Sequence, residues 1–127
     1  MSDIQYVKAV ISKLHQCLIV TLPSTLHSKT LSDLQESVLK QVSDLRPKGV
    51  IIDCSAVEMM DEFEFDSLKK VNSAISIMGT TCKFVSLRPW VVSSLIYLGV
   101  DTDRLPVAFD LEEALSQFSK TKSTPSK

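Results

Sequence analysis

The chain has 127 residues, with 14 basic and 15 acidic side chains and a formal net charge of −1 at pH 7. This length suits one domain around one buried core, and a hydrophobic fraction of 44% excludes a wholly disordered chain. The balanced charge excludes the broad basic surface expected of a protein that binds nucleic acid or an anionic membrane.

The apolar runs and the cysteines indicate a protein of the reducing cytoplasm. The longest apolar runs fall well short of the ~18 residues needed to cross a bilayer, and the N-terminus lacks the features of an export signal. Cys17, Cys54 and Cys82 are odd in number and far apart, which argues against a disulfide framework or a zinc site. We therefore expect a cytoplasmic protein that holds no metal and no cofactor.

The N-terminal part of the sequence predicts a hairpin of two short strands. Residues 6–11 (YVKAVI) alternate partly between apolar and polar, and residues 17–22 (CLIVTL) form the continuous apolar run of a buried strand. Residues 12–16 (SKLHQ) are the predicted turn between them.

A first helix is predicted next. Ser32 with Gln35 three residues later has the form of a capping box, which favours a helix start at this point. The apolar stripe that should face the sheet consists of Leu31, Leu34, Val38, Val42 and Leu45.

The middle of the sequence predicts a buried strand followed closely by a second helix. Residues 49–55 (GVIIDCS) have the pattern of a central parallel strand that is buried on both faces. A second helix of about 17 residues is expected from Asp61, with Gly79 just beyond its end as a stop. Its apolar positions are Phe65, Leu68, Val71, Ile75 and Met78.

Two further strand and helix pairs complete the pattern. Residues 82–87 and 105–109 are predicted strands, and residues 88–99 and 111–118 are predicted helices. Residues 119–127 are polar and low in complexity, so we expect a disordered tail after a domain spanning residues 1–118. Regular alternation after a hairpin predicts an α/β fold, with a mixed, mostly parallel sheet and helices packed against it.

The residue types needed for catalysis are not gathered in this sequence. The only glycines are Gly49, Gly79 and Gly99, each better explained as a boundary of an element than as part of a phosphate-binding loop. His15 precedes Cys17 without a third orienting group, so we interpret this pair as a surface histidine and a core thiol. The carboxylates between residues 53 and 66 are typical of a solvated helix start, and we predict that the chain is not an enzyme.

The order and spacing of several motifs resemble a known family. These motifs are the strand that ends in Asp53, the loop 57–61 (VEMMD), the Met78-Gly79 helix end, the Arg88-Pro89 helix start and the Leu98-Gly99 close. Residues 49–100 carry the main likeness, and weaker similarity extends it to roughly residues 8–118. The sequence resembles the STAS domain (sulphate transporter and anti-sigma-factor antagonist), and within that family the RsbS-like scaffolds of the stressosome.

This resemblance implies a non-catalytic scaffold of a cytoplasmic stress-sensing complex. Such a scaffold associates with itself, as an expected homodimer, and with an RsbR-like STAS co-scaffold, and it binds and releases an RsbT-like switch serine/threonine kinase. The family's phosphate acceptor is a serine directly after the loop aspartate. Here Asp61 matches that aspartate, and Glu62 occupies the position equivalent to the acceptor.

Three interpretations of Glu62 remain open at this point. It is a natural divergence that holds a phosphorylated-like state, an engineered replacement of serine, or an ordinary first-turn helix residue in a chain no longer switched here. Each is compatible with the positive end of a helix dipole. Glutamate carries one charge where phosphoserine carries about −1.5 to −2, so it mimics the phosphorylated form only partly.

The predicted partner surface is centred on residues 55–66. The predicted contact residues beside Glu62 are Ser55, Glu58, Met59, Met60, Asp61 and Phe63. We expect one of the two methionines to be buried and the other exposed. Ser55 and Ser94 are the alternative phosphorylation sites, although an ordinary local hydroxyl is the more common interpretation of each.

Two other functions fit the same sequence. One is a simple anti-sigma-factor antagonist that binds an anti-sigma kinase one to one. The other is a small-molecule-binding STAS module, which would need a pocket at the ends of the strands.

Overall fold

A five-stranded sheet in the order β1-β2-β3-β4-β5 forms the centre of the fold. The computed structural model describes residues 8–102 and 105–122. β1 and β2 pair antiparallel, and every later neighbour pairs parallel, so the predicted mixed and mostly parallel sheet is confirmed. The strands are β1 (Val10–Leu14), β2 (Cys17–Thr21), β3 (Gly49–Asp53), β4 (Thr81–Val85) and β5 (Val107–Ala108).

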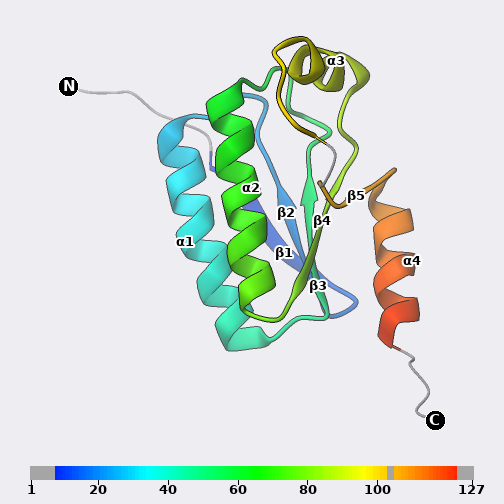
Figure 1. The fold of residues 1–127 in the computed structure, drawn as a ribbon. Coiled ribbons are helices and arrows are strands. Elements are labelled where there is room, and N and C mark those ends of the chain that lie inside the picture. Colours follow the sequence, from blue (N-terminus) through cyan, green and yellow to red (C-terminus); the bar gives the residue numbers. More distant parts are fainter. Residues whose placement is uncertain (1–7, 103–104, 123–127) are drawn as a thin grey trace.

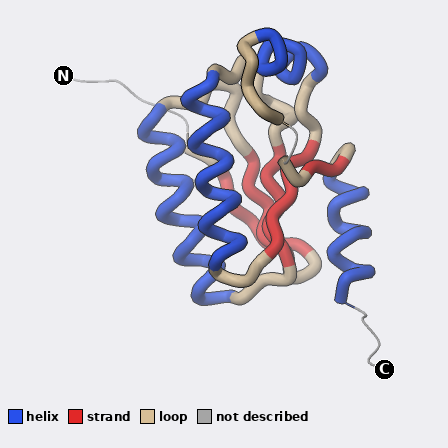
Figure 2. The backbone as a smooth tube through the Cα atoms, in the orientation of Figure 1, coloured by secondary structure: helices blue, strands red, loops and turns tan. Residues whose placement is uncertain are grey.

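The helices cover the sheet unequally. Figure 1 shows α1 and α2 side by side on one face, α4 on the opposite face, and α3 at the end of the sheet where α2 begins. The tube in Figure 2 shows the same layers, with helices on both sides of the strands. The helices are α1 (Ser28–Leu45), α2 (Glu62–Ile77), α3 (Pro89–Tyr97) and α4 (Leu111–Lys122).

The central strand β3 is buried on both faces, as its apolar run predicts. Val50 and Ile52 belong to the core under α1 and α2, whereas Ile51 faces the smaller core under α4. All three side chains are 0% exposed. The period of two along the strand therefore divides the apolar residues between two layers of helices.

The hairpin differs from the prediction in its register. Its turn consists of His15 and Gln16 alone, both with positive φ (52° and 66°), so β1 runs from Val10 to Leu14 and does not end at Ile11. Positive φ at both central residues matches the right-handed twist of the flanking strands. The prediction failed because β1 is an exposed edge strand with a weak pattern. Residues 6 and 7 of the predicted strand lie outside the described part of the chain.

The first helix begins earlier than predicted. Its N-cap is His27, and the predicted capping residue Ser32 is exposed within the helix. Thr30 and Leu31 are both buried, so packing against the core extends the helix by one turn over the local capping signal. Leu45, the last predicted stripe residue, is 44% exposed.

The C-terminal elements also differ in length from their predictions. β5 is reduced to two residues, and α4 continues to Lys122, beyond the predicted domain end at residue 118. Residues 119–122 are therefore helical, against the predicted disordered tail, and the rest of that tail lies outside the described residues. Within the described ranges, no helix has both the length and the apolar character that a membrane crossing requires.

Candidate functional site

Two buried side chains anchor the loop between β3 and α2. Val57 is 0% exposed and Met60 is 4% exposed, and both belong to the main core. Met59 between them is 78% exposed, which confirms the prediction that one methionine is buried and the other is not. The side chains of Val57 and Met60 therefore anchor the loop to the core, and the side chain of Met59 points to solvent.

Hydrogen bonds fix the start of this loop. Asp53 Oδ1 accepts from the backbone N–H of Ser55 at 2.9 Å, which is the geometry of an Asx-turn. Arg88, at the start of α3, donates from Nε to the Ser55 carbonyl oxygen at 2.6 Å and lies 5.2 Å from the ring centroid of Trp90. Glu58 donates from its backbone N–H to the Ser24 carbonyl oxygen at 3.3 Å. Arg88 thereby ties the loop to α3, a contact that the sequence motif did not predict.

A reciprocal capping box starts α2. Asp61 Oδ1 accepts from the Glu64 backbone N–H at 2.8 Å, and Glu64 Oε1 accepts from the Asp61 backbone N–H at 2.9 Å. The local pattern Asp-x-x-Glu, with the exposed carboxylate of Glu62 as the first helical residue, produces this arrangement. The predicted helix start at Asp61 is confirmed.

Opposing effects act on the Glu64 carboxyl group. Desolvation by burial raises its pKa, and the nearby charge of Asp61 raises it further, whereas the hydrogen bond from the Asp61 backbone and the charge of His27 lower it. The net direction is upward. Burial therefore outweighs the capping hydrogen bond, and the raised pKa of Glu64 has a structural explanation.

Loss of the cap gives a direct stability prediction. We expect Asp61→Ala to lower the free energy of unfolding by about 1–2 kcal/mol, because the Glu64 N–H loses its acceptor at the helix start. Urea unfolding followed by circular dichroism measures this change. Asp66→Ala is the control, because Asp66 makes only an exposed i,i+4 pair with Lys70 at 3.5 Å, worth about 0–1 kcal/mol. Equal losses in the two variants would contradict a capping role for Asp61.

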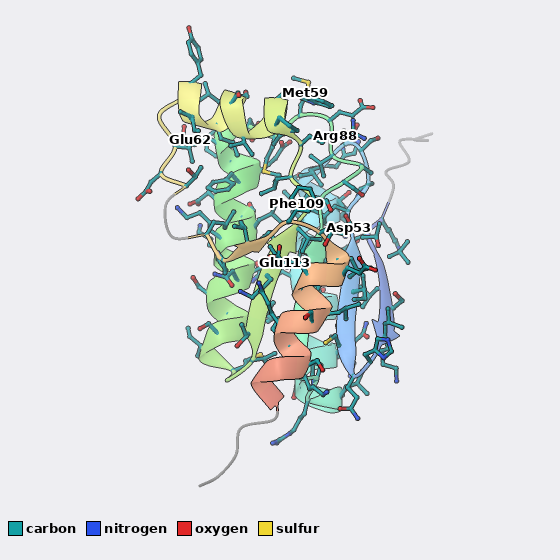
Figure 3. The ribbon with its side chains drawn as sticks, turned by 90° about the vertical axis from the view of Figure 1, so that its right-hand side faces the viewer. Asp53, Met59, Glu62, Arg88, Phe109 and Glu113 are labelled. Carbon is teal, nitrogen blue, oxygen red and sulfur yellow. The ribbon has the colours of Figure 1, made fainter. Side chains whose placement is uncertain are left out.

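The exposed part of the site combines apolar and acidic side chains. Phe63 is 82% exposed, and Ser55, Glu58, Asp61 and Glu62 are exposed as well. Figure 3 shows Glu62, Met59 and Arg88 at the end of the molecule where α2 begins. Met59 and Arg88 lie near one another, and Glu62 lies apart from them on the left of the view. Of the predicted contact residues, only Met60 is withdrawn from the surface.

A groove of about 560 Å³ joins this loop to α3. Glu58, Met59 and Asp61 line it from the loop, and Ser94 lines it from α3. The structure thus brings Ser94 next to the predicted surface, although it lies 33 positions after Asp61 in the chain. Trp90 and Leu98 also line the groove, and neither was predicted as a contact residue.

Trp90 was missed because its local pattern is that of an amphipathic helix. It is 56% exposed, yet it supports Arg88 and lines the groove. Large exposed aromatic residues are enriched at the centres of protein interfaces. A tryptophan in the first turn after Arg88-Pro89 is the signal that could have identified it.

Cysteine and acidic side chains near this loop have structural explanations. Burial raises the pKa of Cys54 and of Cys82 to about 12, so neither thiol forms a nucleophilic thiolate near neutral pH. Asp53 is engaged in the turn at Ser55. The described residues contain no group of three or more metal-ligating side chains.

Comparisons with known proteins agree with this fold. The family model described as the STAS domain matches residues 8–114. The RsbT co-antagonist protein RsbRA of Bacillus subtilis (strain 168) is 21% identical over 97 residues, which are 76% of this chain and 35% of that protein. The chain therefore spans only about a third of the curated relative that it matches.

Two solved structures share the fold over nearly the whole chain. A serine-to-glutamate variant of RsbS from Moorella thermoacetica has a TM-score of 0.79 at 23% identity, with 93% of this chain and 100% of that chain covered. A structure described as the molecular architecture of the stressosome, a signal integration and transduction hub, has a TM-score of 0.77 at 23% identity, with 91% and 100% covered. At these identities the likeness establishes the fold.

Proposed function

Since the chain belongs to the STAS domain family, as the match over residues 8–114 shows, we propose that it is a non-catalytic, cytoplasmic scaffold protein of the stressosome type. Its partners are a second copy of itself, an RsbR-like STAS co-scaffold and an RsbT-like switch kinase. It binds and releases that kinase through the surface centred on residues 55–66. Regulation acts at the junction of this loop with α2, where the chain has Glu62.

The observation that supports this proposal most directly is the position of Glu62, which the capping box holds at the exposed start of α2. The capping box of Asp61 with Glu64 sets the start of α2, and Glu62 follows as the first helical residue, exposed to solvent. A hydroxyl on that residue would be accessible to a kinase. A negative charge there is favoured by the unpaired N–H groups and the dipole of the helix.

The surroundings of Glu62 support a protein partner. Met59 and Phe63 are 78% and 82% exposed. Met59 is followed by the buried Met60, and Phe63 is followed by Glu64, whose carboxylate accepts from the Asp61 backbone N–H in the capping box. Exposed apolar side chains on a rigid backbone bind a partner without a large cost in conformational entropy. The acidic residues around them favour a partner with a basic contact surface.

The test is to restore a phosphate acceptor. Incubated with the switch kinase and ATP, Glu62→Ser is expected to gain phosphate on the introduced serine, because that side chain has the accessible place at the start of α2. Mass spectrometry of proteolytic fragments locates the phosphate. The parent protein is expected to carry none at this residue.

The matched control is Glu112→Ser. Glu112 is another exposed glutamate in the first turn of a helix, but it lies on α4, away from residues 55–66. We expect no phosphate on the serine introduced there. Equal phosphorylation of the parent protein and Glu62→Ser, at Ser55 or Ser94, would show that Glu62 does not occupy the switch position.

The mass of the complex separates this function from its alternative. A stressosome scaffold is expected to form a particle of very large mass when mixed with the RsbR-like co-scaffold. A simple anti-sigma-factor antagonist would instead remain in a small one-to-one complex with its kinase. Light scattering after size-exclusion chromatography distinguishes the two results.

A further inference from the structure

A cavity of about 510 Å³ lies between α3, β5 and the start of α4. Its inner wall is formed by Phe65 of α2 and Leu95 of α3, which are 2% and 1% exposed. Val92 and Leu105 line its sides and are half-buried. The cavity therefore reaches from the surface to the main apolar core.

The mouth of this cavity carries an aromatic ring on a fixed backbone. Phe109 is 81% exposed, yet its N–H donates to Glu113 Oε1 at 2.5 Å and its carbonyl oxygen accepts from the Ser86 N–H at 3.1 Å. Figure 3 shows Phe109 and Glu113 beside one another where α4 begins. Exposed apolar surface that is held in place beside an apolar cavity is a feature of binding sites.

The charge at the mouth restricts the ligand. Among the lining residues that the structure describes, Glu113 is the only one with a charged side chain, and the first turn of α4 adds Glu112 beside it. These carboxylates repel an anionic group, and the lining residues within the described ranges include no cation for it. The larger hollow of about 730 Å³ between α1 and α2 is different, because serine, glutamine, glutamate and lysine side chains line much of it.

We propose that this cavity is a binding site for an uncharged or cationic aromatic molecule. Its volume lies within the range of about 300–1,000 Å³ that is typical of small-molecule sites. It opens where β4 and β5 end, the edge at which parallel sheets commonly bind ligands. Apolar walls bury the rings, and the carboxylate of Glu113 accepts a donor or faces a positive charge. The cavity shares only the buried Phe65 with residues 55–66, so its mouth lies apart from the exposed partner surface there, and the proposal does not depend on the proposed scaffold function.

A pair of fluorescent probes tests the proposal on the full chain. N-phenyl-1-naphthylamine is uncharged, and 1-anilinonaphthalene-8-sulfonate has the same rings with an added sulfonate. Fluorescence titration is expected to give saturable one-to-one binding of the uncharged probe, with a dissociation constant of about 10–200 μM for a molecule of this size. The sulfonate should bind about three to ten times more weakly, because it approaches Glu113.

Two substitutions on the same helix locate the site. Val92→Trp fills the cavity and is expected to weaken binding of the uncharged probe at least about tenfold. Ile96→Trp places the same side chain on the exposed side of α3, where Ile96 is 60% exposed, and should leave the affinity unchanged. Circular dichroism establishes that both variants are folded. If Val92→Trp does not fold, probe-induced chemical shifts at Leu95 and Leu105 of the parent protein make the same test.

Glu113→Gln tests the charge rule while it keeps an acceptor for the Phe109 N–H. It is expected to narrow the difference in affinity between the sulfonated and the uncharged probe, with Glu112 accounting for the part that remains. The proposal is overturned if the uncharged probe does not saturate, or if it binds Val92→Trp as well as it binds Ile96→Trp. Chemical shift changes confined to another part of the chain would overturn it too.

Discussion

Gly49→Ala is expected to lower the free energy of unfolding by about 1–3 kcal/mol, a cost typical of overpacking a core. A Cβ atom at residue 49 would lie 2.5–2.6 Å from three atoms of the Phe118 ring, closer than non-bonded carbon atoms approach. Gly49 begins the central strand β3, which is paired on both sides, so its backbone has little freedom to yield. Phe118, 4% exposed in the core beneath α4, must move instead.

A double-mutant cycle with Phe118→Leu identifies this contact. Leucine lacks the tip of the ring, so the double variant should lose less stability than the sum of the two single variants, by about 1 kcal/mol. Urea unfolding followed by circular dichroism supplies all four free energies. Strict additivity would contradict the proposed clash.

Gly79→Ala is the matched control for this cycle. Gly79 has a φ of +89°, and nothing lies within 4 Å of the position that a Cβ atom would take, so alanine there strains the backbone without meeting Phe118. We expect a cost of about 1 kcal/mol. Its effect should add to that of Phe118→Leu without coupling.

Met59→Asp is expected to weaken binding to the proposed kinase or co-scaffold by about 10- to 100-fold, the range typical of a central interface residue. Met59 is 78% exposed in a loop whose neighbour Met60 is buried, so the substitution adds charge to the contact surface without opening the core. The free energy of unfolding should therefore change by less than about 0.5 kcal/mol. Isothermal titration calorimetry measures the affinity, and urea unfolding measures the stability.

Ile77→Asp provides the control for a general effect of a new surface charge. Ile77 is 86% exposed near the end of α2, far along the helix from Asp61. We expect the partner affinity of this variant to match that of the parent protein. A similar loss in both variants would place the interface elsewhere or make it non-specific.

The accuracy of the sequence predictions depended on how local each signal is. The start of α2 was predicted correctly because Asp61 and Glu64 satisfy one another within a single turn. The start of α1 was not, because burial of Thr30 and Leu31 outweighed the capping pattern at Ser32. Tertiary packing, which a capping motif does not report, decided that boundary.

The candidate site divides in the same way. The sequence correctly predicted that one methionine is exposed and the other is buried, because Met59 and Met60 are adjacent residues of one loop. The hydrogen bond from Arg88 to the Ser55 carbonyl oxygen joins residues 33 positions apart, and no local sequence pattern predicts it. The cavity at Phe109 could not be predicted from the sequence for the same reason, since α2, α3, β5 and α4 each contribute to its lining.

One helix, α3, borders both the apolar cavity and the groove beside the loop. Val92 and Leu95 face the cavity, whereas Trp90, Ser94 and Leu98 face the groove. A ligand and a protein partner that each favour a different position of this helix are thermodynamically linked through it. The factor by which one changes the affinity of the other must then be the same in both directions.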